Sequence, residues 1–322
     1  MNKDFFISVD WGTSTFRLRT VNKSSLQKED EIILPVGVRD LYQQWQQEGG
    51  DRELMFLNFL NQQISQLKAV IPVEETEVVI SGMASSNIGI CELQYLPLPL
   101  NILFKGLFVK HLQNQIFPHG IYLISGICSN QDIMRGEETQ LLGLITEEDF
   151  QRKSMFILPG THSKHILCDH GIVADFDSFM TGELFQAICE KTIIKNSVTT
   201  PPSEFANWKS FEEGVFQSRK KKSLLNELLR IRSRNILDNK TPAENYYFLS
   251  GLLIGEELVT LKSRSFDKLL LCAGRNLYAP YYRALQVLEL DKKAHVIDEL
   301  TVEDAVCKGQ LRVLNQYRNS KT

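Results

Sequence analysis

The chain has 322 residues, a length that favours two domains, each large enough to bury a core of its own. Hydrophobic residues make up 43% of it and charged residues 23%, proportions that exclude a disordered or fibrous protein. The 36 basic and 39 acidic side chains give a formal net charge of -3, so no overall positive field draws the chain to nucleic acid or to an anionic membrane. Any anionic ligand therefore has to be held by local groups.

The N-terminal apolar run, residues 5–9, is too short for a signal sequence or for the roughly 20 residues of a membrane span. The six cysteines lie far apart and include no C-x-x-C pair. This spacing indicates a reducing compartment and no disulfide framework. We therefore expect a cytoplasmic protein.

Segments with a strand pattern alternate along the chain with segments of helical spacing. The expected strands are 5–9, 15–21, 77–80, 120–124, 155–158, 165–168, 172–176 and 268–272. The expected helices are 51–70, 137–144, 182–194, 223–231, 244–261, 278–288 and 302–317. Residues 196–210, which include Pro201 and Pro202, predict a loop. The alternation predicts an α/β fold.

One pattern occurs twice. A strand leads into the turn 12–15 (Gly-Thr-Ser-Thr), and 148 residues later another strand leads into the turn 160–163 (Gly-Thr-His-Ser). Each copy is followed by an apolar strand that ends in a small residue and a glycine, Gly82 in the first and Gly274 in the second. Internal duplication is the simplest explanation and predicts two related halves, while chance recurrence of Gly-Thr turns is the alternative.

A Gly-Thr turn between two strands presents consecutive backbone N–H groups and short hydroxyls, which can surround phosphate oxygens. Asp10 ends the strand before the first turn, where a carboxylate can hold Mg²⁺ beside a phosphate. The second turn has Pro159 at that place and offers Lys164 instead. The two turns together predict a polyphosphate site, with ordinary hairpin turns as the alternative.

The residues from Asp10 to Ser14, with Arg17 shortly after them, resemble the first phosphate loop of the actin, hexokinase and Hsp70-type ATPase superfamily. Longer blocks resemble one sugar-acid kinase family within it, the 2-dehydro-3-deoxygalactonokinases. These blocks are 81–83, 86–89, 134–141, 159–164, 180–184 and 249–255. They follow one another in the family's order over nearly the whole chain.

The resemblance implies two related actin-like (ribonuclease H-like) ATPase domains, 1–150 and 151–322, flanking a nucleotide cleft. It implies an ATP- and Mg²⁺-dependent kinase that phosphorylates the 6-hydroxyl of 2-dehydro-3-deoxy-D-galactonate in galactonate catabolism. The alternatives are a kinase of another 2-keto-3-deoxy sugar acid, an exopolyphosphatase-like phosphohydrolase on the same fold, and a non-catalytic nucleotide-dependent regulator. A homodimer is left open, and no nucleic-acid or membrane partner is expected.

The resemblance also implies the site residues. Asp10 would hold Mg²⁺, and Asp10, Glu137 and Glu138 are the candidates for the base that accepts the proton of the attacking hydroxyl. For the two glutamates, a favourable charge at a helix N-terminus is the alternative. The residues expected to bind ATP are Gly12, Thr13, Ser14, Thr15, Gly160, Thr161, His162, Ser163, Lys164, Ala273, Gly274, Arg275 and Asn276.

The sugar acid needs donors for its carboxylate and hydroxyls. A segment after a strand end can supply them, here Gly82, Met83, Ser85, Ser86 and Asn87. The candidates for a bidentate clamp on the carboxylate are Arg17, Arg135 and Arg232, with Arg135 favoured because it adjoins Glu137.

Other features are expected to be structural. His165 lies on the opposite strand face from Cys168 and His170, so these residues and His162 predict no zinc site. The basic run 219–222 and the arginines 230, 232 and 234 predict a solvated helix face rather than a nucleic-acid site, because no aromatic residues interleave with them. Gly251 and Gly255 allow close helix packing.

Overall fold

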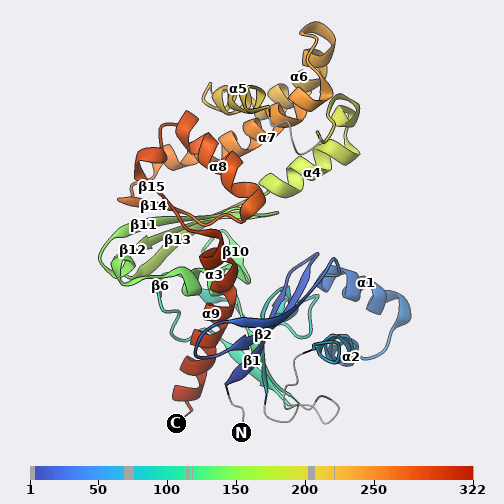
Figure 1. Ribbon diagram of the computed structural model, residues 1–322, viewed down its shortest axis with the longest axis vertical. Coiled ribbons are helices and arrows are strands. Elements are labelled where there is room, and N and C mark those ends of the chain that lie inside the picture. The colour runs from blue at the N-terminus through green and yellow to red at the C-terminus, as the bar shows by residue number, and fades with distance from the viewer. Residues whose placement is uncertain are drawn as a thin grey trace. The chain divides into compact units, whose positions relative to one another are not determined.

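The computed structural model describes residues 4–68, 76–113, 117, 119–201, 207–220 and 222–321 (Figure 1). The chain forms two compact units. Unit 1 comprises Met1–Phe150, Gly171–Asp175 and Leu300–Thr322, and unit 2 comprises Gln151–His170 and Phe176–Glu299. Each unit contains a β-sheet with helices packed against it.

The sheet of unit 1 has its first strand in an interior position. Its order is β3 (Lys28–Leu34), β2 (Phe16–Asn22), β1 (Phe5–Trp11), β4 (Glu77–Gly82), β8 (Gly120–Ile124) and β7 (Val109–Leu112). Strands β1, β2 and β3 form an antiparallel meander, β4 and β8 continue the sheet parallel to β1, and β7 is antiparallel to β8. In this register Asp10 lies opposite Arg17 on one side and Ser81 on the other.

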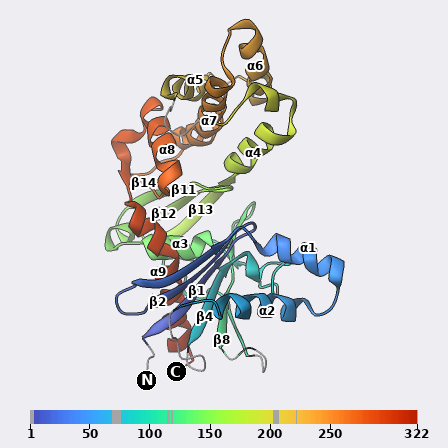
Figure 2. The same ribbon diagram turned by 45° about the vertical axis from the view of Figure 1, so that its right-hand side comes forward.

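Helices cover both faces of this sheet (Figure 2). Helices α1 (Val38–Glu48) and α2 (Arg52–Ile64) pack on the face that carries Ile7 and Val9. Ser8 alternates to the other face, where it contacts Cys307 of α9 (Glu299–Asn319). Helix α3 (Glu137–Leu144) packs backbone to backbone on α9, because a Cβ built on Gly309 would lie 1.9 Å from the carbonyl oxygen of Thr139.

The sheet of unit 2 repeats this arrangement. Its order is β13 (Ile172–Phe179), β12 (Ser163–Asp169), β11 (Lys153–Leu158), β14 (Lys268–Leu271) and β15 (Ala294–Val296). Strand β12 is antiparallel to β11, and β14 and β15 follow in parallel, as β2, β4 and β8 do around β1. The first residues of β13 belong to unit 1, where they pair with β6 (Leu100–Asn101).

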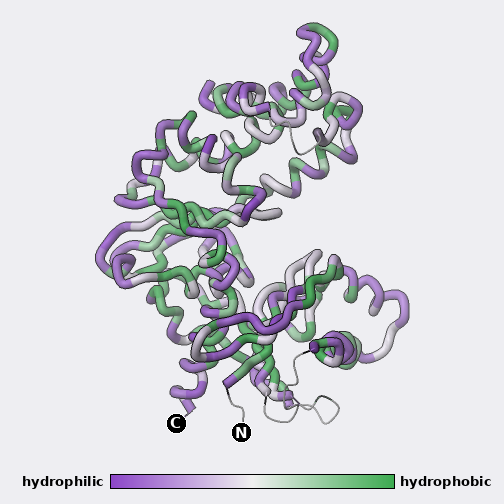
Figure 3. Tube along the Cα trace, viewed as in Figure 1, coloured by the Kyte–Doolittle hydropathy of each residue, from purple (hydrophilic) through white to green (hydrophobic). Residues whose placement is uncertain are grey.

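The shared strand order is that of the ribonuclease H-like, actin-like ATPase fold. The predicted fold class is confirmed, and the same topology in both units supports the inferred internal duplication. Figure 3 shows the hydrophobic stretches concentrated in the strands, whereas the helices alternate between hydrophobic and hydrophilic residues. This alternation is typical of helices that pack one face on a sheet.

The helices of unit 2 are α4 (Thr181–Lys191), α5 (Trp208–Ser218), α6 (Leu224–Leu237), α7 (Pro242–Val259) and α8 (Arg275–Val287). Helices α5, α7 and α8 pack on β11 and β14 through residues such as Phe211, Leu258 and Tyr281. A Cβ built on Gly251 would lie 2.0 Å from the carbonyl oxygen of Phe211, so the expected close helix packing is present between α7 and α5.

The remaining elements are short. A small sheet contains β10 (Ile133–Met134), β9 (Ile127–Cys128) and β5 (Leu96–Pro97). Single turns of 3₁₀-helix are formed by Met83–Ser85, Glu147–Phe150, Ile193–Ser197, Thr260–Ser263 and Asp291–Lys293. Within the described ranges no helix is both long and apolar enough to cross a membrane.

The structure has a strand or a helix at every expected segment and adds others. The elements that were not predicted are the strands β3, β5, β6, β7, β9, β10 and β15 and the helices α1 and α5. The predicted loop 196–210 ends earlier, since α5 begins at Trp208; its residues 202–206, with Pro202, lie outside the described residues. The expected helix 51–70 corresponds to α2, which ends at Ile64, and residues 69–70 lie outside the described residues.

Two expectations need correction. The basic run is not a helix face, because Arg219 caps the C-terminus of α5 and Lys220 and Lys222 lie in the connection to α6; Lys221 is not described. The unit that begins after residue 150 does not extend to residue 322. Helix α9 returns to unit 1, where Gln310 donates to the carbonyl oxygen of Val9 over 2.9 Å.

Candidate active site

The first turn, which we call loop 1 (residues 12–15), is fixed by the start of α1. The N–H of Gly12 donates to the carbonyl oxygen of Thr15 over 2.8 Å and closes the turn. The N–H of Val38 donates to the carbonyl oxygen of Gly12 over 3.0 Å. Gly37 lies so close that a built Cβ would be 2.0 Å from the carbonyl oxygen of Thr13. The first amides of α1 thus engage the carbonyl side of loop 1.

Arg39 also reaches loop 1, although no motif pointed to it. Its guanidinium donates to the Oγ of the exposed Ser14 over 2.6 Å. Its own N–H donates to the carbonyl oxygen of Thr13 over 3.2 Å. Gly37 and Arg39 are therefore additional candidates for the phosphate site. The sequence signal that points to them is the glycine three residues before Asp40, a spacing typical of a helix start.

The second turn, which we call loop 2 (residues 160–163), is fixed in the same way by the start of α4. A Cβ built on Gly182 would lie 2.6 Å from the carbonyl oxygen of Gly160. The N–H of Glu183 donates to the carbonyl oxygen of Thr161 over 3.0 Å, and its carboxylate lies 2.6 Å from Nε2 of His162. In both units the helix after the third strand thus carries a glycine that packs on the loop.

Loop 2 presents only part of itself to solvent. Thr161 and His162 are exposed, whereas Ser163 and Lys164 are buried. The Oγ of Ser163 lies 2.8 Å from the hydroxyl oxygen of Tyr281, and Nζ of Lys164 donates to the carbonyl oxygen of His162 over 3.3 Å. Ser163 and Lys164 therefore already have partners inside unit 2.

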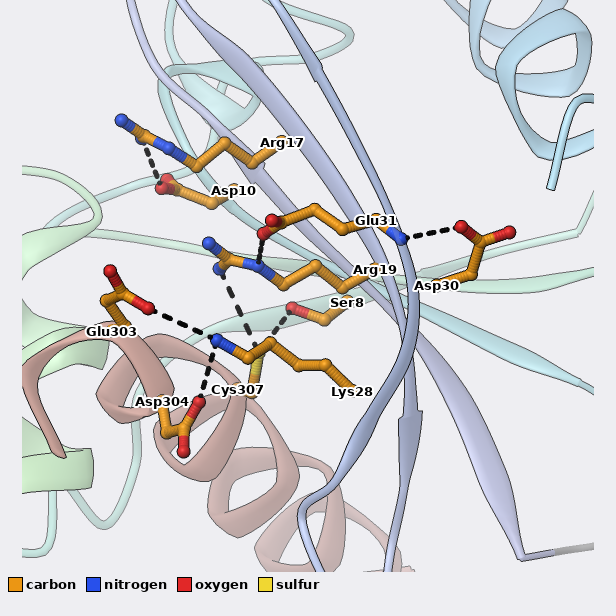
Figure 4. Close-up of polar contacts among 10 residues, drawn as sticks. All are labelled: Ser8, Asp10, Arg17, Arg19, Lys28, Asp30, Glu31, Glu303, Asp304 and Cys307. Atoms are coloured by element: carbon orange, nitrogen blue, oxygen red, sulfur yellow. Dashed lines mark hydrogen bonds and ion pairs between the residues drawn. The ribbon is translucent and has the colours of Figure 1, made fainter. Parts of the chain in front are cut away.

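Asp10 stands at the end of β1, directly before loop 1. Its Oδ2 lies 3.0 Å from NH1 of Arg17, and the two side chains are 21% and 40% exposed (Figure 4). Figure 4 also shows three neighbouring ion pairs: one joins Arg19 to Glu31 within the sheet, and two join Lys28 to carboxylates of α9. Asp10 thus has a fixed direction and remains partly accessible.

Two glycines bring the start of α3 next to the end of β1. Gly82 has φ +94°, and a Cβ on it would be 2.6 Å from the carbonyl oxygen of Trp11. Gly136 has φ +113°, and a Cβ on it would be 3.1 Å from the Cα of Gly82. Because the three backbones are in contact, Asp10 and Glu137 project from adjoining segments of unit 1.

The two adjacent glutamates of α3 differ in environment. Glu138 is 1% exposed and accepts hydrogen bonds from the N–H of Gly136 over 2.7 Å and from the hydroxyl of Thr139 over 3.0 Å. Burial, followed by the nearby charge of Glu137, raises the pKa of Glu138 to about 8. Glu137 is only half-buried. At neutral pH the Glu138 carboxyl is therefore mostly protonated.

The segment expected to bind the sugar acid uses its serine hydroxyls internally. Ser85 Oγ donates to the carbonyl oxygen of Ile124 over 2.6 Å, and Ser86 Oγ donates to that of Met83 over 2.7 Å. Met83 is half-buried, and Asn87 is exposed. Of the side chains in this segment, Asn87 is the most accessible to a ligand.

Arg135 is 7% exposed and holds this segment in place. Its NH1 donates to the carbonyl oxygen and to the Oγ of Ser85, over 2.5 and 2.7 Å, and its NH2 donates to the carbonyl oxygen of Leu93 over 3.0 Å. The guanidinium carbon also lies 4.1 Å from the centre of the Tyr95 ring. The N–H groups of Arg135 that would bind a substrate carboxylate thus already donate to Ser85 and Leu93.

Arg232 belongs to unit 2. It is exposed on α6 and lines an open groove of about 320 Å³ together with Leu229 and Ile236 of the same helix. The larger cavity of unit 2 has other walls, so the structure does not bring Arg232 to it.

That larger cavity has a volume of about 440 Å³ and is lined mainly by aromatic and apolar side chains. Its walls include Trp208 of α5, Tyr246 and Tyr247 of α7 and Asn276 of α8, and Gly160 of loop 2 also lines it. Loop 2 and the predicted adenosine residue Asn276 thus share one cavity.

The other residues expected near adenosine surround the start of α8. Ala273 is buried after β14, whereas Gly274 and Arg275 are exposed. Among the described residues, and apart from its chain neighbours and its own helix backbone, no heavy atom lies within 4 Å of a Cβ built on Gly274. The backbone of Gly274 is therefore open to a ligand.

The histidines set aside in the sequence have separate partners. His162 contacts Glu183, His165 contacts Glu257 and His170 contacts Asp169. In the part of the chain that the structure describes, no group of three or more His, Cys, Asp or Glu side chains is arranged to hold a metal ion.

The sequence matches the family model of 2-keto-3-deoxy-galactonokinase over residues 10–312. It is 31% identical over 227 residues to the 2-dehydro-3-deoxygalactonokinase of Escherichia coli (strain K12), covering 69% of this chain and 74% of that one. It is 28% identical over 305 residues to DgoK1 of Rhizobium meliloti (strain 1021), covering 92% and 93%. A 2-dehydro-3-deoxygalactonokinase crystal structure from Sinorhizobium meliloti superimposes with a TM-score of 0.79 at 26% identity, covering 98% and 96%. The chain therefore belongs to the 2-keto-3-deoxy-galactonokinase family of phosphotransferases.

Proposed function

We propose that the protein transfers the γ-phosphoryl group of ATP to the 6-hydroxyl of 2-dehydro-3-deoxy-D-galactonate, in the cytoplasm, as a step of galactonate catabolism. The products are ADP and 2-dehydro-3-deoxy-6-phosphogalactonate. The observation that carries the proposal is the pair of loops backed by glycine-containing helix starts, in a chain of this kinase family. Phosphoryl transfer depends mainly on positioning and charge stabilisation, which such loops provide.

The nucleotide is assigned to unit 2. Adenosine fits the aromatic cavity, where Trp208 and Tyr247 offer ring faces and Asn276 offers an amide that can hydrogen-bond the base. Gly160 lines the same cavity, so phosphates attached to the ribose would meet loop 2. The exposed Thr161 and His162, with the loop amides, are the groups available to them.

Asp10 is assigned to Mg²⁺. Carboxylate oxygens are preferred Mg²⁺ ligands, and the partly exposed carboxylate beside loop 1 fits that role. When bound, Mg²⁺ neutralises charge on the phosphate oxygens. Arg17 orients the Asp10 carboxylate through their ion pair. Loop 2 has Pro159 where loop 1 has Asp10, so only loop 1 offers a carboxylate at this point.

Glu137 is assigned as the base. It accepts the proton of the 6-hydroxyl while that oxygen bonds to phosphorus and the bond to the ADP oxygen breaks. Glu138 suits this role less well, because its carboxyl is buried, accepts two hydrogen bonds and is mostly protonated at neutral pH. Glu138 instead anchors the start of α3 beside Gly136.

The sugar acid is assigned to unit 1. Arg17 is the most accessible of the candidate arginines of this unit and can bind the substrate carboxylate, while Asn87 and the backbone amides of 82–85 can bind hydroxyls. We give Arg135 a positioning role, because it fixes Ser85 and with it this segment. Arg232, in its separate groove, is not needed in this scheme.

The test is an ADP-release assay with Mg-ATP across a panel of 2-keto-3-deoxy sugar acids. The panel includes the galactonate- and gluconate-derived acids, which differ in one hydroxyl configuration, and a control without sugar acid. We expect the highest kcat/KM with the galactonate-derived acid and a phosphate monoester at C6 by ³¹P NMR. Phosphate or ADP release that ignores the sugar acid would instead identify a phosphohydrolase.

A further inference from the structure

Glu257 on α7 is a buried carboxylate of unit 2 that belongs to none of the phosphate or adenosine segments. It is 2% exposed. Three side chains from three elements converge on it: His165 of β12 at 3.0 Å, Tyr281 of α8 at 2.8 Å, and the hydroxyl of Thr181 at the start of α4. Its two oxygens take three of the roughly four hydrogen bonds that a carboxylate can accept, and the three partners are held in fixed directions.

A chain of hydrogen bonds joins loop 2 to Glu257, and in each of them the group farther from Glu257 is the donor. A carboxylate only accepts, so the Tyr281 hydroxyl gives its single proton to Glu257. Burial and the Glu257 charge raise the pKa of Tyr281 well above its ordinary value, so the phenol keeps that proton. The hydroxyl of Ser163, 2.8 Å away, must then donate to the Tyr281 oxygen. Ser163 Oγ in turn accepts from the N–H of Gly160 over 3.4 Å.

A second route from Glu257 reaches the same loop. Thr181, which donates to Glu257, directly precedes Gly182. Gly182 packs against Gly160, where a Cβ would be 2.6 Å from the carbonyl oxygen. Loop 2 is thus held from α8 through Tyr281 and from α4 through Thr181, and both routes end on one carboxylate. Thr181 and Tyr281 also line the 440 Å³ cavity.

Stability alone is a weak reason to keep such a group. Replacing buried ionic groups by well-packed apolar residues is often neutral or stabilising, whereas fixed dipoles and loops lower the reorganisation needed for phosphoryl transfer. Because the network ends at Gly160 and Ser163 of loop 2, its effect falls on the residues assigned to phosphate.

We propose that Glu257 is a positioning residue for the phosphates of the nucleotide, and that Tyr281 and Ser163 transmit its effect to loop 2. The proposal rests on the assignment of the nucleotide to unit 2. Glu257 touches no phosphate itself. It sets the loop so that its amides have the right direction before the nucleotide binds.

Tyr281→Phe tests this with the least disturbance, because it removes one hydroxyl and keeps the ring that lines the cavity. Tyr278→Phe, on the same helix, is the matched control, since Tyr278 is 39% exposed and lies outside the network and the cavity wall. Calorimetry with adenosine, ADP and a non-hydrolysable ATP analogue separates binding of the nucleoside from binding of the phosphates.

We expect Tyr281→Phe to weaken ADP and the ATP analogue about tenfold and to change adenosine less than twofold, with an unchanged KM for the sugar acid. Tyr278→Phe should behave as the wild type. Equal weakening of adenosine and ADP would mean that Tyr281 only shapes the cavity and would overturn the proposal. The proposal would also be overturned if the wild type binds ADP more tightly than adenosine and Tyr281→Phe binds all three ligands as the wild type does.

Ser163→Ala and the double variant provide an independent check. Both substitutions break the same chain of hydrogen bonds, so the double variant should bind ADP no more weakly than the weaker single variant. Additive losses would contradict the chain. Glu257→Ala removes the shared acceptor of His165, Tyr281 and Thr181 and should have the largest effect on ADP; if it does not fold, the other variants decide. A wild type that binds ADP no better than adenosine would refute the nucleotide assignment itself.

Discussion

Gly37 lies directly against the backbone of Thr13: a Cβ on Gly37 would stand 2.0 Å from the carbonyl oxygen of Thr13. Real Cβ atoms do not approach so closely, so α1 and loop 1 fit together only with glycine at this position. In unit 2, Gly182 of α4 has the same relation to loop 2, at 2.6 Å from the carbonyl oxygen of Gly160. The shape of each loop therefore depends on a glycine that follows it by about 20 residues in the sequence.

Gly37→Ala is expected to lower kcat/KM for ATP at least about tenfold, because loop 1 or the start of α1 must move to admit the methyl group. It should also lower the free energy of unfolding by about 1–3 kcal/mol. Gly50→Ala is the control: Gly50 has φ +88° and no neighbour within 4 Å, so it should lose stability but keep its kinetics. Kinetic constants of Gly37→Ala that match those of Gly50→Ala would show that loop 1 tolerates the shift.

The phosphate loops were predictable because their chemistry lies in consecutive residues. Their supports were not, since the contact of Gly37 with Thr13 and of Gly182 with Gly160 joins segments that are distant in sequence. Strand β3, which leads to Gly37, escaped prediction because it is polar on one face and none of its residues is fully buried. Local periodicity carries little signal for such an edge strand.

Helix α5 was missed for a different reason. Asn207 caps it by accepting a hydrogen bond from the N–H of Ser210, a local signal that the preceding prolines overrode. The helix has Gly214 in its interior, a residue with low helix propensity. Its stability comes from packing: a Cβ on Gly214 would lie 2.2 Å from the carbonyl oxygen of Phe248 on α7. Such tertiary stabilisation is not readable from the segment itself.

In the candidate site, too, the residue types were predictable from the sequence but their environments were not. Adjacent acidic residues look alike in a sequence, yet Glu138 is buried while Glu137 is half-buried, and Glu257 is buried while Glu256 is not. Arg135 was favoured for the substrate carboxylate because it adjoins Glu137. Its principal partner is Ser85, 50 residues away, and only the folded chain brings them together.

Glu138 should make stability depend on pH. Its pKa is raised to about 8 in the folded protein from an ordinary 4.5, so the folded state holds a proton that the unfolded state releases. This contribution to stability is complete below pH 4.5 and is lost as the pH rises through about 8. Between pH 5 and 8, the free energy of unfolding of the wild type should fall relative to Glu138→Gln by roughly 1 kcal/mol per pH unit. Urea unfolding at several pH values measures this, and parallel curves for the two proteins would contradict it.

Glu137→Gln should lower kcat by about 10²–10⁴-fold with little change in KM for either substrate, because only the proton acceptor is lost. Glu138→Gln is the matched comparison on the same helix, and below pH 7 its kcat should stay within about tenfold of the wild type. Steady-state kinetics with both substrates varied will separate the two. The reverse order of effects would move the base to Glu138.

Asp10→Asn should raise the Mg²⁺ concentration needed for half-maximal activity and lower turnover far more than ATP affinity. The amide keeps the size of the side chain but lacks the charge that holds a divalent cation and pairs with Arg17. Mg²⁺ titrations of the initial rate, with ATP binding measured separately, test this. Near wild-type turnover at the same Mg²⁺ concentration would refute the role given to Asp10.

Gly274→Ala tests whether the nucleotide contacts this backbone, because the substitution should hardly affect the stability of the protein. Gly274 caps the N-terminus of α8 with φ -70°, and a Cβ there meets no heavy atom within 4 Å, so Gly274→Ala should change the free energy of unfolding by less than about 1 kcal/mol. If adenosine approaches this backbone, the added methyl group occupies its space, and adenosine and ADP should both weaken by about tenfold. Gly274→Ala should thus weaken adenosine and ADP equally, whereas Tyr281→Phe should weaken ADP and leave adenosine nearly unchanged. Calorimetry that finds both ligands unaffected by Gly274→Ala would place the nucleoside elsewhere in unit 2.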